Sequence, residues 1–273
     1  MDCPQSRRGL SDEACNDRPK ERVHKDMSRP SFPLISLIVS GGHTQLIYMK
    51  NHNHFEIIGT THDDAVGEVF DKIAKILGLP YPGGPSISKT AETGNPEKYH
   101  LPHPKMPNYD FSFSGLKTAV LRAIQKELNL PISTPSNQLA TKLSDQQIAD
   151  FAASFQNTAI DILVEKLQIA VQNYQPKSVL LAGGVAANSL LREKVSKAFP
   201  DPLESRLGRN DEPRNGGPKE RVRKDPINLF SPEMKFATDN AAMVASAAYF
   251  AIQEGEQPTD PYNLDISPRS EIT

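Results

Sequence analysis

The sequence predicts a layered α/β domain, and three observations support that prediction. Aliphatic and β-branched runs of strand length come first, amphipathic runs of helical period follow them, and a strand–turn–helix unit comes later. The chain has 273 residues, enough for one large domain or two small ones. Only 37% of the residues are hydrophobic, and the 23 prolines outnumber the 16 glycines. This composition predicts solvated segments inside an otherwise folded protein.

Five strands are expected. Leu34–Ser40 and Gln45–Lys50 are aliphatic runs separated by Gly-Gly-His-Thr, which is typical of a hairpin-like pair. Phe55–Thr60 is expected to be the third strand. Ser178–Ala182 has the composition of a buried strand, and Met234–Ala237 is expected to form a short one near the end.

Helical period predicts five helices. Asp63–Leu77 has an apolar stripe, with Asp63 or Asp64 as N-cap and Gly78 as the stop. Tyr81–Pro85 is expected to be a turn, because its glycines and prolines disfavour helix and strand alike. The remaining helices are expected at Gly115–Leu128, Asp145–Tyr174, Asn188–Phe199 and Ala241–Gln253, with a polar loop at Asn129–Ser144.

Two distant stretches of the chain repeat each other. Ser6–Asp26 and Ser205–Asp225 share 13 of 21 residues without a gap, and both lack apolar periodicity. The copies hold 13 of the 31 Lys+Arg and 9 of the 33 Asp+Glu, so the rest of the chain carries a net charge of about −6. We interpret them as an inserted, disordered element; a pair of RNA-binding arms is disfavoured because acids are interleaved with the basic residues.

The repeat defines the predicted domain organisation. Residues 1–32 are expected to be a disordered tail from the inserted element, and residues 33–254 the core. The core is interrupted by a disordered insert at about 201–226, and residues 255–273 are expected to be a C-terminal tail.

Composition and motifs exclude several classes of protein. The apolar run Leu34–Val39 is far too short to cross a bilayer, and no signal-peptide pattern opens the chain. Cys3 and Cys15 are the only cysteines, which excludes a disulfide framework. HExxH, GxSxG, GxGxxG and P-loop motifs are absent. The sequence therefore predicts a soluble cytoplasmic protein that is neither a zinc protease of that type nor a serine hydrolase.

Three glycine pairs could place backbone N–H groups against a phosphate. Gly41-Gly42 and Gly183-Gly184 each follow a predicted strand, and Gly83-Gly84 lies in the predicted turn. Taken singly, the first two pairs are better explained as ordinary tight turns. Asn188 lies where the next helix begins, so the positive end of that helix dipole would strengthen phosphate binding at the second pair.

Two carboxylates stand out. Asp71 lies at the edge of an apolar helical stripe, where it could have a functional role or could simply be an acid on a solvated helix face. The solvated helix face is the favoured explanation for Glu68. Asp239 opens an alanine-rich helix, either as a simple N-cap or as a carboxylate presented to a metal. The seven histidines are better explained as surface residues, because none has HxxxH spacing.

Together, six strings resemble one family, the TsaD/Gcp tRNA N6-adenosine threonylcarbamoyltransferases. They are LIVSGGHTQLI, DDAVGEVFDKIAKILGLPYPGGP, FSFSGLKTAV, IADFAASFQ, LLAGGVAANSLLR and FATDNAAMVA. The resemblance implies an actin/Hsp70-like (ASKHA) ATPase fold of two lobes with a cleft between them. It also implies transfer of threonylcarbamoyl from threonylcarbamoyl-adenylate to N6 of the adenosine next to the anticodon in tRNAs that read ANN codons.

The resemblance assigns site residues by motif. The substrate loop corresponds to Ile38, Val39, Ser40, Gly41 and Gly42. Further adenylate-binding positions correspond to Asp71, Gly84 and Asn188, and the metal ligand corresponds to Asp239; no covalent nucleophile is assigned. Ser88 occupies a position that some members fill with Asp.

The chain also departs from the family pattern. The family's ETSCD-like strand and its HxxxH helix, both upstream of SGGH, are missing, and His24 alone cannot replace the two histidine ligands. The first lobe is therefore expected to be incomplete and the second largely retained. The strands within Leu34–Lys50 are expected to lack their sheet neighbours and to present an exposed edge.

The resemblance implies one divalent metal ion, iron or zinc. The implied partners are tRNA, a TsaB-like paralogue, a TsaE-like ATPase and a separately encoded N-terminal fragment. No association with a membrane is implied. The alternative is a non-catalytic remnant or scaffold that binds the partner subunits of the modification complex. A sugar or acetate kinase-like relative is disfavoured, because the strings match the transferase motifs.

Overall fold

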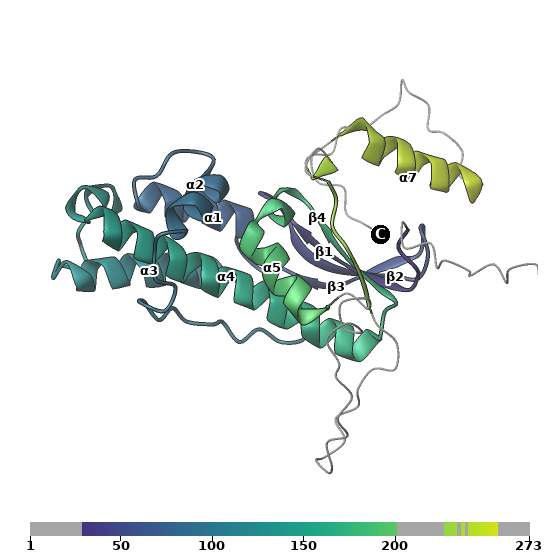
Figure 1. Cartoon of the computed structure of the whole chain (residues 1–273), viewed down its shortest axis with the longest axis horizontal. Coiled ribbons are helices and arrows are strands. Elements are labelled where there is room, and N and C mark those ends of the chain that lie inside the picture. The colour runs from purple at the N-terminus through teal and green to yellow at the C-terminus, as the bar shows by residue number, and fades with distance from the viewer. Residues whose placement is uncertain (1–28, 201–226, 234–235, 238–239, 256–273) are drawn as a thin grey trace, which may run out of the picture.

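The computed structural model describes residues 29–200, 227–233, 236–237 and 240–255 (Figure 1). The predicted insert at about 201–226, most of the tail at 1–32 and nearly all of the tail at 255–273 lie outside these residues. The strands are β1 (Leu34–Val39), β2 (Thr44–Met49), β3 (Phe55–Thr60), β4 (Ser178–Ala182) and β5 (Asn228–Phe230). The α-helices are α1 (Val66–Ile76), α2 (Gly83–Ala91), α3 (Ser114–Glu127), α4 (Asp145–Tyr174), α5 (Ser189–Ala198) and α7 (Ala241–Gln253). Short 3-10 helices are η1 (Ser136–Gln138), η2 (Ala140–Lys142) and η3 (Gly184–Ala187).

The strands form one mixed sheet in the order β3-β2-β1-β4-β5. β1 pairs antiparallel with β2 and parallel with β4, so it lies at the centre. β2 pairs with β3, and β4 pairs with β5. The expectation that the strands within Leu34–Lys50 lack sheet neighbours is therefore wrong. β1 pairs with β4 from far along the chain, β2 pairs with the next strand, β3, and the edge strands of this sheet are β3 and β5.

One further strand was predicted in the wrong place. Phe236 lies in a 3-10 turn and Ala237 in a bend, so the described part of Met234–Ala237 is not a strand. The last strand is β5, where Leu229 pairs with Val179. Its three residues are too few for an alternation that sequence can detect.

The helix around Asp71 begins later than predicted. Its N-cap is Ala65 rather than Asp63 or Asp64, and no side chain caps it. The predicted turn at Tyr81–Pro85 is also partly wrong, because Gly83 already begins α2. Proline is tolerated in the first turn of a helix, where its missing N–H would have no intrahelical partner.

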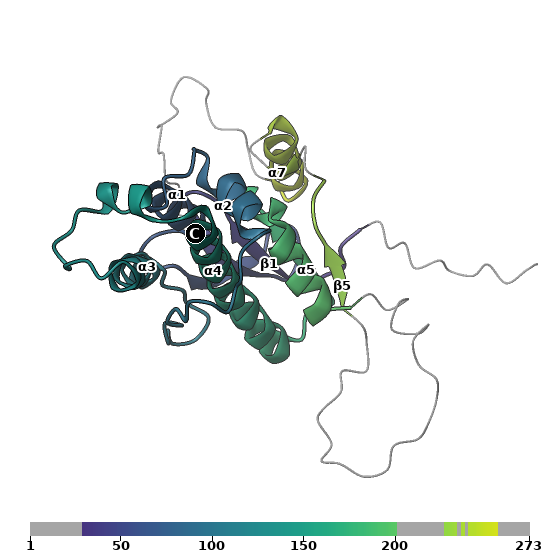
Figure 2. The same ribbon diagram turned by 60° about the vertical axis from the view of Figure 1, so that its left-hand side comes forward.

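The hydrophobic core lies between one face of the sheet and helices α1, α3, α4 and α5 (Figures 1 and 2). Helix α4 passes through this core; it begins with a capping box formed by Ser144 and Gln147. The Phe155 ring of α4 contacts Phe70 of α1 edge-on, with ring centroids 4.9 Å apart. The sheet contributes alternate side chains to the core: Ile35, Leu37, Val39, Leu46, Val179 and Leu181.

Candidate functional site

Two of the glycine pairs meet at the carboxyl ends of the inner strands β1 and β4. β1 and β4 are parallel neighbours, and Ile38 pairs with Ala182 at their carboxyl ends. The turns that follow, Ser40–Gly42 and Gly183-Gly184, therefore leave the sheet side by side. In open α/β sheets, ligands bind in the crevice outside the carboxyl ends of such strands.

The first glycine turn is packed against the beginning of α1. The Gly67 N–H donates to the Ser40 carbonyl oxygen at 3.2 Å, and the Val66 N–H donates to Thr44 Oγ1 at 2.9 Å. A Cβ at Gly67 would lie 2.6 Å from the Ser40 oxygen, so glycine is required for this approach. The positive end of the α1 dipole thus faces the turn.

Within the turn, N–H groups converge on one oxygen. The N–H groups of Gly42 and His43 donate to Ser40 Oγ at 3.3 and 3.0 Å. Gly41 and Gly42 are exposed, and a Cβ on either would meet nothing within 4 Å. The Val39 side chain is buried in the core, so only its backbone could contact a ligand.

Asp71 joins α1 to the beginning of α2. Its Oδ1 accepts a hydrogen bond from the Gly83 N–H at 2.7 Å. A Cβ at Gly83 would lie 2.6 Å from the Asp71 Cα, whereas one at Gly84 would meet nothing within 4 Å. Asp71 and Gly83 also border a cavity of about 540 Å³ that continues along α1 to the exposed Tyr81 ring.

Asn188 belongs to a three-residue polar network. Its Oδ1 caps α5 by accepting from the Leu191 N–H at 3.0 Å. Its Nδ2 donates to Ser88 Oγ at 2.9 Å and to Gln156 Oε1 at 3.0 Å. Ser88 Oγ donates to the same Gln156 oxygen at 2.8 Å. The network fixes the orientation of the Asn188 amide and joins α2, α4 and α5.

Sequence reasoning missed Gln156. It is buried on α4 at the end of the IADFAASFQ string, among apolar side chains. A polar residue within an apolar helical stripe was the available signal, because buried polar groups need partners.

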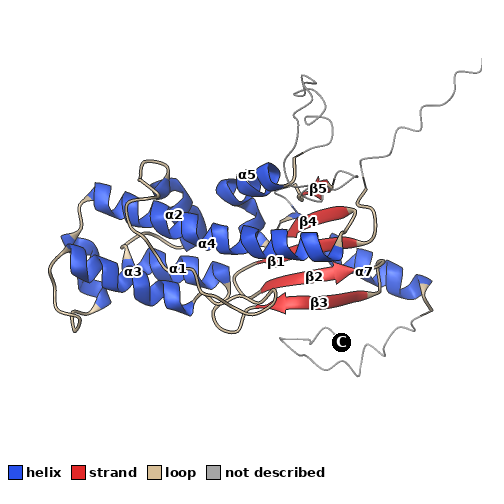
Figure 3. Cartoon of the chain, turned by 90° about the horizontal axis from the view of Figure 1, so that it is seen from below, coloured by secondary structure: helices blue, strands red, loops and turns tan. Residues whose placement is uncertain are grey.

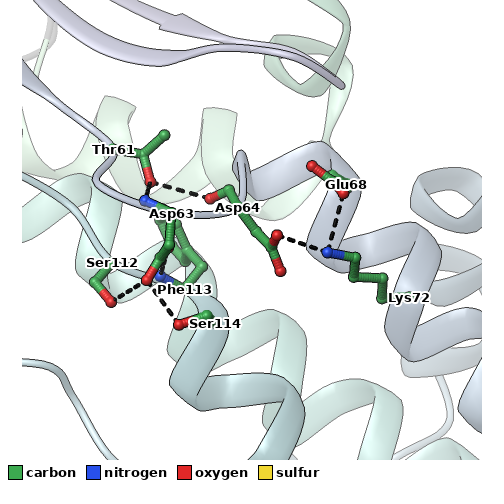
Figure 4. Close-up of polar contacts among 8 residues, drawn as sticks. All are labelled: Thr61, Asp63, Asp64, Glu68, Lys72, Ser112, Phe113 and Ser114. Carbon is green, nitrogen blue, oxygen red and sulfur yellow. Dashed lines mark hydrogen bonds and ion pairs between the residues drawn. The ribbon is translucent and has the colours of Figure 1, made fainter.

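Asp63, predicted as an N-cap of α1, instead binds the beginning of α3 (Figure 4). Its Oδ1 accepts from the Phe113 N–H at 2.7 Å, and its Oδ2 accepts from the hydroxyls of Ser112 and Ser114 at 2.5 and 2.7 Å. Burial raises the pKa of Asp63, but these hydrogen bonds outweigh it and hold the pKa below its ordinary value.

Asp64 and Glu68 do not bind α3; they form ion pairs with Lys72 (Figure 4). Hydrogen bonds to Asp64 and Glu68 raise the pKa of Lys72. Glu68 is exposed, as predicted for a solvated helix face.

An Asp63→Asn substitution is expected to lower the free energy of unfolding by about 1 kcal/mol at pH 7, because α3 loses charge-assisted hydrogen bonds at its first turn. The folded-state pKa lies below the ordinary value of 3.8. The stabilisation is therefore complete above that value and is lost as the pH falls through the folded-state pKa. Urea denaturation at several pH values measures this. The matched control, Asp64→Asn, should change stability less; a pH-independent difference for Asp63→Asn would contradict the expectation.

The predicted metal ligand Asp239 lies outside the described residues. Within the described ranges, no group of three or more His, Cys, Asp or Glu side chains could hold a metal ion.

Among the helices that the structure describes, none is long and apolar enough to cross a membrane.

The chain is similar to proteins of known family. Residues 21–246 match the family model described as TsaD: tRNA N6-adenosine threonylcarbamoyltransferase. Relatives bearing that name are 45% identical over 87% of this chain in Symbiobacterium thermophilum and 41% identical over 89% in Bacillus subtilis. This chain spans only 58% and 60% of their lengths. Among solved structures, the match to the crystal structure of T. kodakarensis HypF has 17% sequence identity and covers 74% of this chain and 21% of the HypF chain. The TM-score of this match is 0.42, which supports no conclusion.

Proposed function

The chain belongs to the TsaD family of tRNA N6-adenosine threonylcarbamoyltransferases, and we propose that it takes part in the transfer of threonylcarbamoyl to tRNA. The proposed donor is threonylcarbamoyl-adenylate. The proposed acceptor is N6 of the adenosine next to the anticodon in tRNAs that read ANN codons. An α/β unit with a mixed sheet is observed; we propose that it belongs to an actin/Hsp70-like arrangement of two lobes.

A single observation carries the proposal: motifs that are far apart in the sequence come together near the carboxyl ends of β1 and β4. The Ser40–Gly42 turn lies beside Gly183-Gly184, because β1 and β4 are parallel neighbours. Asn188, which follows the second turn, is hydrogen-bonded to Ser88 of α2. The beginning of α2 is in turn hydrogen-bonded to Asp71 of α1.

The proposed reaction exchanges one bond for another. The N6 lone pair of the adenosine attacks the carbamoyl carbon, and the N6–C bond forms. The bond from that carbon to the phosphate oxygen breaks, and AMP leaves with the electron pair. The proton lost by N6 passes to solvent. Direct attack of this kind requires no protein nucleophile, in agreement with the absence of a motif-placed Ser or Cys.

The chain's own contribution is to bind and orient the adenylate. Open backbone at Gly41-Gly42 and Gly84 lets a ligand approach closely. The Gly42 and His43 N–H groups already converge on an oxygen, Ser40 Oγ, as they would on an oxygen of the leaving phosphate. Donors placed where negative charge develops would lower the barrier. We also propose one divalent metal ion, iron or zinc, by resemblance to the family.

The proposed partners follow from the resemblance and from charge. Outside the two repeat copies the chain carries a net charge of about −6. Because phosphate contacts dominate tRNA affinity, we propose that other polypeptides supply basic surface for tRNA. We propose a TsaB-like paralogue, a TsaE-like ATPase and an N-terminal fragment as these partners, acting in the cytoplasm.

The test is transfer of labelled threonylcarbamoyl from added adenylate to unmodified tRNA. The full chain is assayed alone and with the open reading frame immediately upstream. We expect activity in the pair, and we expect Asn188→Ala to reduce it by at least ~100-fold through loss of a positioned amide.

Asn188→Asp separates the two roles of this side chain. Aspartate retains the oxygen that caps α5 but loses the Nδ2 donor to Ser88 and Gln156. Stability close to wild type together with lost transfer would support a role in the site. Soluble protein without transfer in either assay would instead favour a remnant or a scaffold for the modification complex.

A further inference from the structure

The amide of Gln156 has one atom without a hydrogen-bond partner. Gln156 lies on α4, and its side chain is buried, with 7% of the residue exposed. Its Oε1 accepts hydrogen bonds from Ser88 Oγ at 2.8 Å and from Asn188 Nδ2 at 3.0 Å. Its Nε2 donates to no acceptor among the residues that the structure describes. A donor in a buried side chain needs a partner, because leaving it unpaired costs free energy.

The hydrogen bonds of the network decide which atom of Gln156 is unpaired. The backbone N–H of Leu191 can only donate, so the Asn188 atom that it contacts at 3.0 Å must be Oδ1. The Asn188 atom that faces Gln156 is then Nδ2, a donor, which requires an acceptor. Gln156 therefore presents Oε1 to the network, and Nε2 with its two N–H groups is left outside it.

The unpaired donor is accessible to a ligand. Gln156 Nε2 is not among the unpartnered polar side-chain atoms that the described part of the fold encloses fully. This atom therefore reaches solvent, although most of the side chain that carries it is buried. A ligand arriving there would meet two N–H donors that no described residue satisfies.

Open backbone lies beside two members of the network. Figure 3 shows α2 and α5 both alongside α4. Gly84 precedes Ser88 on α2 by about one helical turn and therefore shares its face. Gly184 begins η3, the turn that leads to Asn188. A Cβ on either glycine would meet nothing within 4 Å, so a flat group can approach the backbone next to the Gln156 amide.

This inference rests on the proposed function, in which the chain binds an adenylate. The phosphate of that adenylate is assigned to the N–H groups of the Ser40–Gly42 turn, at the positive end of the α1 dipole. A neutral amide on a different helix is suited to the uncharged part of the ligand. Adenine offers such acceptors in its ring nitrogens N1, N3 and N7. We propose that Gln156 Nε2 donates a hydrogen bond to a ring nitrogen of adenine and thereby helps to select this base.

The competing explanation is that water alone satisfies the Nε2 group. Analogues of AMP in which one ring nitrogen is replaced by C–H distinguish the two explanations, since each analogue removes a single acceptor. The full chain is titrated calorimetrically with AMP, 1-deaza-AMP, 3-deaza-AMP and 7-deaza-AMP, without tRNA and without any transfer assay. We expect one of the analogues to bind at least ~10-fold more weakly than AMP.

Gln156→Met removes the amide at nearly constant side-chain length. We expect this variant to bind AMP at least ~10-fold more weakly than the wild-type chain and to lose the preference for AMP over that analogue. Gln156→Glu lacks the donor but keeps an oxygen for Ser88 and Asn188, so it preserves the network and should lose the same preference. Gln146→Met is the matched control, because Gln146 lies on the same helix and bonds Asp150 instead. It should bind all four nucleotides like the wild-type chain.

Equal affinity of the wild-type chain for AMP and all three analogues would overturn the inference, as would an unchanged preference in both Gln156 variants. Absence of AMP binding by the full chain would overturn it too. Failure of the proposed function gives a different result. Base preference that is lost in the Gln156 variants, together with no transfer to tRNA in either assay, would support the adenine contact and contradict the transfer.

Discussion

A Gly183→Ala variant is expected to lose about 3 kcal/mol of folding free energy, the largest single effect at this site. Gly183 has φ +88° and ψ 167°, a backbone conformation that is nearly confined to glycine. An added Cβ would also overlap the Val39 carbonyl oxygen of β1. The strained backbone contributes ~1–3 kcal/mol and the overlap ~1–3 kcal/mol. The change would force β4 and β1 apart where the two glycine turns meet.

The measurement is urea denaturation of the two variants Gly183→Ala and Gly184→Ala. A Cβ at Gly184 would meet nothing within 4 Å, so that variant should be as stable as wild type or slightly more stable. Equal loss in both variants would show that the turn has a different conformation. Unchanged stability of Gly183→Ala would contradict the strand-end packing itself.

Gly83→Ala is expected to have the second-largest effect, at about 2 kcal/mol of destabilisation. A Cβ there would lie 2.6 Å from the Asp71 Cα and 2.7 Å from the Phe70 carbonyl oxygen. Because these are backbone atoms of a packed helix, α2 must move away from α1. That movement breaks the Asp71–Gly83 hydrogen bond and displaces Ser88, so the affinity for AMP should fall at least tenfold.

Gly84→Ala provides the contrast. Its Cβ would enter open space, so stability should remain within ~0.5 kcal/mol of wild type. If the adenylate approaches the backbone at this position, the affinity for AMP should nevertheless fall. Calorimetric titration with AMP and urea denaturation of both variants separate the two effects. Loss of AMP affinity in Gly83→Ala alone would place the ligand elsewhere.

The two glycines of each pair therefore have different roles. In Gly183-Gly184 and in Gly83-Gly84, the first glycine permits close packing of two elements, and the second leaves the backbone open. Sequence alone treats the members of each pair alike. Only the tertiary packing shows that the first glycine of each pair is needed for close packing and that the second leaves the backbone accessible to a ligand.

Local sequence patterns are sufficient to predict most of the helices and strands. Predicted ranges for β3, α4, β4 and α7 agree with the structure at both ends, because each run is bounded by turn or cap residues. Motif resemblance determined the family, now supported by the match over residues 21–246. The substrate-binding roles of Ile38–Gly42, Asp71, Gly84 and Asn188 remain predictions.

The association of these elements depends on long-range packing. Pairing of β1 with β4 joins residues about 140 positions apart, a relation that no local period contains, and it is the reason the expected sheet edge was wrong. Asp63 could cap the nearer helix by sequence, but the fold brings the first turn of α3 to its carboxylate. Gln156 gained its role because the packing of α2, α4 and α5 places it against Ser88 and Asn188. Local propensity fixes where elements begin and end, whereas long-range packing fixes which polar groups meet.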